Sequence, residues 1–206
     1  MTQASDNPFS NTPSPNPERV LIVACGALAR EIIALKELNG WDHFVLQCLP
    51  ADLHLTPDKI PDAVEKIVLA ARGDFAKIFV AYADCGTGGL LQKRCADLAV
   101  EMIKGPHCYS FFDGNETFEQ RGEVTSFFLT DFLARQFDAF VWRPMGLDRH
   151  PELRDMYFGN YEKLVYLAQT NDAALDEKAE QAAARLGLTY ERRFTGYGDL
   201  ETALAP

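Results

Sequence analysis

Residues 79–89 indicate the fold class and read Phe79-Val80-Ala81-Tyr82-Ala83-Asp84-Cys85-Gly86-Thr87-Gly88-Gly89. It begins within a short apolar run, residues 78–82, which is typical of a buried parallel strand. The strand ends at Asp84-Cys85, and three glycines within four residues then lead into a helix expected from Leu90. This order of strand, glycine turn and helix places a loop at the carboxyl edge of an open sheet, where α/β proteins bind ligands.

The same alternation of strand and helix continues along the chain. Further strands are expected at residues 19–24, 44–49, 100–103, 164–168 and 188–193, with helices at residues 27–38, 56–72, 90–98 and 173–186. The pattern predicts an α/β fold with an open, mainly parallel sheet and helices on both faces. Residues 110–140 are rich in phenylalanine and are expected to form a mainly helical insertion over the sheet edge.

Composition bounds the domain organisation, the kinds of partner and the cellular compartment. The chain has 206 residues and a net charge of −10. Residues 1–17 are rich in Ser, Asn, Thr and Pro and are expected to be a disordered lead-in to a single α/β domain, residues 18–206. An acidic chain without a basic stripe or a long apolar run argues against a nucleic-acid or membrane partner. We therefore expect a cytoplasmic protein whose five cysteines are thiols, metal ligands or catalysts.

Three predicted strand ends carry a cysteine beside a glycine or close to a proline. The motifs read Ala24-Cys25-Gly26, Asp84-Cys85-Gly86 and Pro106-His107-Cys108. If the strands are neighbours, the three sulfurs meet at one sheet edge. Three thiolates and one open position suit a zinc ion or an iron–sulfur cluster. Two alternatives remain, reactive thiols without a metal and inert packing of small apolar side chains.

Three polar residues near these motifs are candidate catalytic groups. His107 is a fourth ligand, a general acid or base, or a loop histidine that bonds to backbone. Asp84 either orients a ligand or forms an Asx-turn. Asp131 interrupts an apolar segment and is either a buried functional carboxylate or a helix N-cap.

The turn residues are candidates for cofactor binding. Gly26, Gly86, Thr87, Gly88 and Gly89 could present backbone N–H groups to an anion at a helix N-terminus. The turn lacks the Gly-Lys-Ser/Thr ending of a P-loop, and tight packing would also explain the glycines. The phenylalanines are expected to be core, with a flat tetrapyrrole box as the alternative. Glu31 is expected to be an exposed helix carboxylate, with a carboxylate that reaches the sheet edge as the alternative.

Five segments together carry a resemblance to a known family: ACGAL, YADCGTGG, GPHCY, FLTDFL and RRFTGYGDLE. The combination resembles the domain-of-unknown-function family 1638 over residues 19–204. The resemblance implies that Cys25, Cys85 and Cys108 are the motif cysteines, with Cys48 and Cys95 outside the motifs. It also implies proximity to corrinoid-dependent methyltransferase systems of bacteria and methanogens.

These observations favour one class of function. We expect a Cys-ligated zinc or iron–sulfur protein, an enzyme that acts on a small-molecule substrate in one-carbon or corrinoid-linked methyl transfer. A corrinoid would then be supplied by a partner protein. The alternatives are a non-catalytic metal or tetrapyrrole accessory protein, and a small-molecule binding module in which the cysteines only pack.

Overall fold

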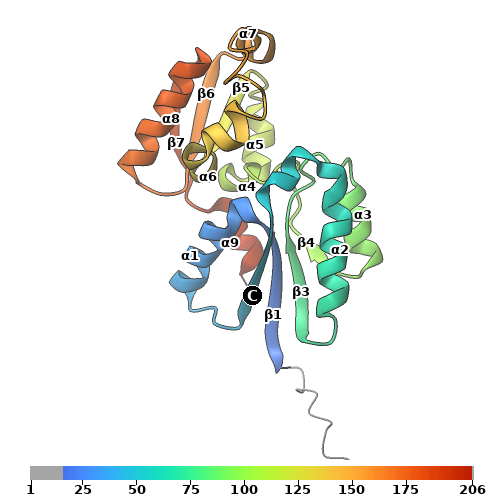
Figure 1. Cartoon of the computed structure of the whole chain (residues 1–206). Coiled ribbons are helices and arrows are strands. Elements are labelled where there is room, and N and C mark those ends of the chain that lie inside the picture. The colour runs from blue at the N-terminus through green and yellow to red at the C-terminus, as the bar shows by residue number, and fades with distance from the viewer. Residues whose placement is uncertain (1–15, 206) are drawn as a thin grey trace, which may run out of the picture.

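The strands are divided between two parallel sheets, which form two lobes (Figure 1). The computed structural model describes residues 16–205, so nearly all of the predicted lead-in, residues 1–17, lies outside the described residues. The first strand begins at Asn16 and so takes in the last two residues of that segment. The α/β class with parallel strands is confirmed, although the sequence predicts one sheet and the structure has two.

The first lobe contains a parallel sheet with the strand order β2-β1-β3-β4. Its strands are β1 (Asn16–Cys25), β2 (Phe44–Leu49), β3 (Phe75–Ala81) and β4 (Glu101–Met102). Its helices are α1 (Ala29–Asn39), α2 (Ile60–Ala71), α3 (Leu90–Asp97) and α9 (Gly198–Leu204). Figure 1 shows the sheet between α1 and α9 on one side and α2 and α3 on the other. Because both faces are covered, the middle of β1 is wholly apolar and buried.

The second lobe contains a parallel sheet with the order β5-β6-β7. Its elements are β5 (Ser126–Thr130), α6 (Asp131–Arg135), the π-helical segment η4 (Asp138–Trp142), α7 (Leu153–Phe158), β6 (Lys163–Ala168), α8 (Ala173–Leu186) and β7 (Thr189–Phe194). The short helices α4 (Ser110–Asp113) and α5 (Asn115–Arg121) connect the lobes. The apolar side of α8 packs on one face of this sheet, with Leu164 and Tyr166.

Residues 110–140 are mainly helical, as the sequence predicts, but they also contain strand β5, which the sequence does not predict. The run Ser126-Phe127-Phe128-Leu129-Thr130 pairs with β6 in parallel. Phe128 packs with Val165 and Leu167 on one face, and Leu129 packs with the α8 side on the other. A short apolar run buried on both faces has no period that separates a strand from a helix. The segment therefore begins a second core instead of forming a cap.

The chain returns to the first lobe at its C-terminal end. Helix α9 follows β7, and its Leu200 and Leu204 join the same core as Phe111, Phe112 and β1. The two lobes are thus connected twice, through α4 and α5 and again before α9. No helix among residues 16–205 combines the length and the apolar character needed to cross a membrane.

Candidate functional site

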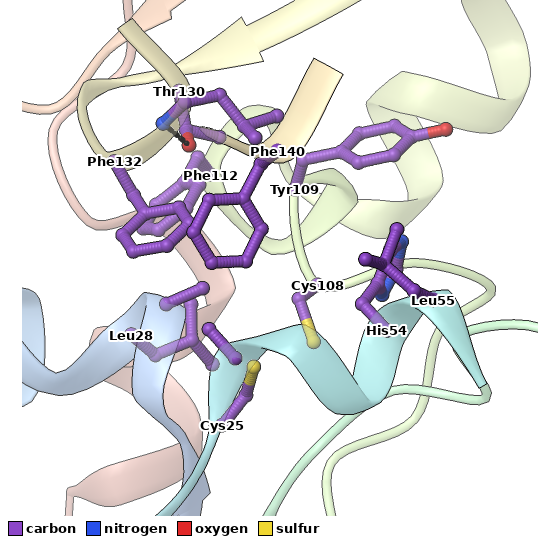
Figure 2. Close-up of a pocket in the computed structure, with 13 residues that line it drawn as sticks. Cys25, Leu28, His54, Leu55, Cys108, Tyr109, Phe112, Thr130, Phe132 and Phe140 are labelled. Atoms are coloured by element: carbon purple, nitrogen blue, oxygen red, sulfur yellow. Dashed lines mark hydrogen bonds between the residues drawn. The ribbon is translucent and has the colours of Figure 1, made fainter. Parts of the chain in front are cut away.

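A cavity of about 100 Å³ lies at the junction of the lobes, where the carboxyl ends of β1 and β5 meet. Its lining is mostly apolar and consists of Cys25, Ala27, Leu28, Ala51, His54, Leu55, Cys108, Tyr109, Phe112, Thr130, Phe132, Leu133 and Phe140. Figure 2 shows Phe132 and Phe140 facing Cys25 and Cys108 across this space. We call this cavity the thiol pocket.

The structure brings the three predicted cysteines to one edge of the first sheet. The Sγ atom of Cys85 lies 3.0 Å from the Sγ atom of Cys108, and the titration of Cys25 is electrostatically coupled to both. Cys48 is exposed and Cys95 is buried within α3, and none of the five cysteines is in a disulfide bond.

Backbone hydrogen bonds explain why two distant segments meet here. The N–H of Asp84 donates to the carbonyl of Gly105, and the N–H of Cys85 donates to the carbonyl of Pro106, each at 3.0 Å. These bonds continue the pairing of β3 with β4 beyond the ends of the strands. The loop that carries Cys108 is therefore held alongside the turn that carries Cys85.

The two sulfurs in contact differ in acidity. The pKa of Cys85 is lowered to about 5, chiefly because the Cys108 thiol donates a hydrogen bond to it. Burial opposes this shift, whereas His54 and the backbone N–H of Cys108 add to it. The pKa of Cys108 is raised well above its ordinary value by the same contact with Cys85 and by burial. At neutral pH the shared proton therefore lies on Cys108 and Cys85 is a thiolate.

Cys25 is the third sulfur and behaves differently. Burial raises its pKa to about 11, against smaller opposing effects from the backbone of Ala27 and from the Tyr82 hydroxyl. That hydroxyl is buried next to Cys25 and has no hydrogen bond of ordinary geometry among the described residues. Cys25 is thus a neutral thiol beside the pair formed by the Cys85 thiolate and the Cys108 thiol.

His54 is the site residue that the sequence analysis missed. It lies on the 3-10 helix η2 (Ala51–Leu55), directly after β2, and lines the thiol pocket. Its interaction with Cys85 raises its pKa. The rule that singled out the cysteines, a chemically active side chain just beyond the end of a parallel strand, would also have selected His54.

His107 lies next to this group without lining the pocket. Its ring stacks on Tyr109, with 4.8 Å between the centroids, and its carbonyl accepts hydrogen bonds from Ser110. Burial lowers its pKa, so it is neutral at physiological pH. Its role as an acid, base or ligand stays a prediction.

Asp84 accepts hydrogen bonds from the glycine turn that follows it. Its carboxylate accepts hydrogen bonds from the Thr87 hydroxyl at 2.8 Å and from the N–H groups of Gly88 and Gly89 at 3.1 and 2.6 Å. Both N–H groups are therefore already paired within the chain, and a bound anion would have to displace the carboxylate. Gly86, Gly88 and Gly89 have positive φ, and so does Cys85 at +49°, which is a strained conformation for a residue with a Cβ atom.

Gly26 serves a different purpose, because it permits a close approach of backbones. A Cβ atom at this position would lie 3.0 Å from the carbonyl oxygen of Leu49. The turn after β1 is thereby packed against the end of β2, which brings Cys25 near the helix that carries His54. The structure thus supports packing at Gly26, and cofactor binding there stays a prediction.

Asp131 is fully buried at the end of β5. Its carboxylate accepts hydrogen bonds from the Tyr166 hydroxyl at 2.7 Å, the Gln169 N–H at 3.0 Å and the Thr170 hydroxyl at 2.6 Å. It also pairs with Arg135 at 3.6 Å. Asp131 therefore ties the carboxyl ends of β5 and β6 together, and its predicted catalytic role stays a prediction.

The donor types at the thiol pocket suit a soft metal, but their arrangement does not. Within residues 16–205, no group of three or more His, Cys, Asp or Glu side chains is arranged to hold a metal ion. Coordination by Cys25, Cys85 and Cys108 would require these side chains to turn toward a common centre.

Comparison with known proteins adds the family. No curated protein matches the chain. One solved structure, the ornithine carbamoyltransferase from Pyrococcus furiosus, is 13% identical over 87% of this chain, and its TM-score of 0.22 is too low to show a shared fold. This chain corresponds to only 56% of that protein. The model of the family described as "Protein of unknown function (DUF1638)" matches residues 48–204, which include His54, Cys85 and Cys108 but not Cys25. The chain therefore belongs to the DUF1638 family.

Proposed function

We propose that Cys85, which does not itself line the thiol pocket but contacts the pocket residue Cys108, is the reactive thiolate of a centre that acts on a small, mainly apolar molecule. The observation that carries this proposal is the 3.0 Å contact between the sulfurs of Cys85 and Cys108 beside an apolar cavity. A thiolate held by a neighbouring thiol donor is the nucleophilic form of cysteine at neutral pH.

The reaction class that suits this centre is transfer of a one-carbon group to sulfur. The Cys85 thiolate would attack a methyl carbon, forming an S–C bond while the bond from that carbon to the donor breaks. The electron pair of the broken bond leaves with the donor. The phenyl rings of Phe132 and Phe140 provide an apolar environment for a methyl group. A corrinoid protein as methyl donor and partner is part of this proposal.

A metal centre is the second candidate function. It is favoured by the presence of three free cysteines at one sheet edge, since soft thiolates select zinc and iron–sulfur clusters. In this case Cys25, Cys85 and Cys108 are the ligands after side-chain rotation. No step of the reaction above depends on a metal.

The two candidates are separated by metal analysis of anaerobically purified protein together with thiol labelling. The proposed thiolate centre predicts protein without stoichiometric zinc or iron, in which methyl methanethiosulfonate modifies Cys85 at pH 6, found by peptide mass spectrometry. Cys85→Ser should abolish that modification. Cys95→Ser is the matched control and should leave it intact, because Cys95 lies within α3.

Each outcome of that experiment has a meaning. If the parent contains stoichiometric metal that is lost in Cys85→Ser and kept in Cys95→Ser, the metal centre is the correct candidate and the thiolate nucleophile is rejected. Metal-free protein whose Cys85 is unreactive at pH 6 would contradict both candidates.

A further inference from the structure

Glu31, on helix α1 of the first lobe, is only 4% exposed, contrary to the sequence expectation of an exposed carboxylate. One part of its carboxylate interacts with its own backbone N–H, whereas its Oε2 atom is buried without a hydrogen-bond partner among the described residues. Burial is also the main reason that its pKa is raised. A buried polar atom left without a partner is unfavourable and therefore calls for an explanation.

Arg135, at the end of α6 in the second lobe, has a buried donor atom without a partner in the described part of the chain, which complements the unpaired acceptor of Glu31. Its Nη2 atom pairs with Asp131 at 3.6 Å, but its Nη1 atom is buried and has no partner within residues 16–205. The charges of Arg135 and Glu31 affect each other, yet the two side chains form no ion pair in the structure. An unpaired donor on one lobe thus lies near an unpaired acceptor on the other.

Both side chains line the same cavity, which has a volume of about 310 Å³. The remaining lining residues are Arg30, Ile33, Ala34, Glu37, Thr170 and Tyr197. The wall therefore carries two arginines, two glutamates and two hydroxyls. None of these residues lines the thiol pocket, so this second cavity is a separate site.

We propose that this cavity binds a small zwitterion of the amino-acid type, whose ammonium group pairs with Glu31 and whose carboxylate pairs with Arg135. A simple cation would leave the Nη1 atom of Arg135 unpaired, and a simple anion would leave the Oε2 atom of Glu31 unpaired. A volume of about 300 Å³ is at the lower end of the range for small-molecule sites. Because Glu31 and Arg135 belong to different lobes, the ligand would also hold the lobes together.

Isothermal titration of the full chain with glycine, L-alanine and L-glutamate tests the proposal, with methylamine and acetate as probes that carry one charge each. We expect at least one amino acid to bind, and to bind more tightly than either methylamine or acetate. Absence of binding by all three amino acids would overturn the proposal, and so would acetate or methylamine binding as tightly as the amino acid.

Variants identify the site. Glu31→Gln keeps the shape of the side chain and removes its charge, so affinity should fall about tenfold or more, as expected for loss of a charge-assisted hydrogen bond. Arg135→Gln should have a similar effect on the carboxylate end. Glu119→Gln, on the exposed face of α5, is the control and should bind as the parent does.

Equal affinity of the parent and of a folded Glu31→Gln variant would refute the assignment. Cys85→Ser should bind the amino acid normally, because Cys85 lies outside this cavity. Failure of the zwitterion site therefore leaves the proposed thiolate centre standing, and the reverse also holds.

Discussion

At the scale of single residues, Cys85 is distinguished from its neighbours by the hydrogen-bond donors around it. Burial alone raises the pKa of a thiol, as it does for Cys25 and Cys95, both to about 11. Cys85 is as deeply buried, but the Cys108 thiol and His54 both favour its charged form. One thiolate is therefore stabilised among thiols that stay protonated.

The contact between Cys85 and Cys108 predicts which disulfide forms first. Their sulfurs are 3.0 Å apart, so a small movement reaches the bond length of about 2.05 Å. Diamide, which takes up the two hydrogen atoms that the thiols lose, should link Cys85 to Cys108 before any other pair. Peptide mass spectrometry without reduction measures the product. Cys95→Ser should form the same link, and a first product that joins Cys25 to Cys48 would contradict the arrangement.

At the scale of elements, the turn from β3 to α3 depends on Asp84. Burial would raise its pKa, but the N–H groups of Gly88 and Gly89 and the Thr87 hydroxyl together lower it below its ordinary value. The stability contributed by the ionised carboxylate is thus present above the ordinary pKa and is lost as pH falls through the lowered one.

Removal of this carboxylate should destabilise the fold. We expect Asp84→Ala to lower the free energy of unfolding by about 1–3 kcal/mol at pH 7, since it removes the charged acceptor of the hydrogen bonds from Thr87, Gly88 and Gly89. Asp84→Asn keeps one acceptor oxygen and should cost less. The control is Asp97→Ala, which removes an exposed ion pair with Lys93 and should cost at most about 1 kcal/mol. Urea unfolding measures all three, and equal losses for Asp84→Ala and Asp97→Ala would count against this account.

Local sequence was sufficient for the elements of the first lobe. Apolar runs followed by glycine turns predicted β1, β3 and their helices, and parallel topology then brought Cys25, Cys85 and Cys108 to one edge. The same logic failed for β5, because Phe127 and Phe128 occur among many other phenylalanines and the run has no distinguishing period. The division into two sheets depends on this strand, so it could not be predicted.

Two misplaced residues show why the site was only partly predicted. His54 is not among the residues that the sequence singles out, although its position after β2 places it at the same edge. Glu31 was expected on a solvated helix face. It is buried because it faces the junction with the second lobe near Arg135. Contacts between lobes join residues distant in sequence, and no local pattern records them.

For the molecule as a whole, helix α9 brings the chain back from the second lobe and packs in the core of the first lobe, which fixes the two lobes relative to each other. Gly198 begins this helix at φ +50°, and a Cβ atom there would overlap the carbonyl groups of Phe111 and Phe112 in α4. The docking of α9 therefore requires a residue without a side chain at this position.

Gly198→Ala should accordingly destabilise the protein by about 3 kcal/mol or more, because backbone carbonyl groups cannot move aside without separating α9 from α4. Gly196 provides a matched control. Its φ is also positive, at +60°, but a Cβ atom there meets no atom within 4 Å, so Gly196→Ala should cost only about 1 kcal/mol. Thermal unfolding compares them, and a Gly198→Ala variant as stable as Gly196→Ala would argue against the docking of α9.

Ionisation of Cys85 beside the thiol pocket can be measured from the pH dependence of its chemical modification. The rate at which methyl methanethiosulfonate labels Cys85 should rise with pH to a plateau, with a midpoint near pH 5. In Cys108→Ala the largest stabilising donor is gone and the midpoint should move upward. A parent midpoint near the ordinary thiol value of 9.0, unchanged in Cys108→Ala, would contradict the account.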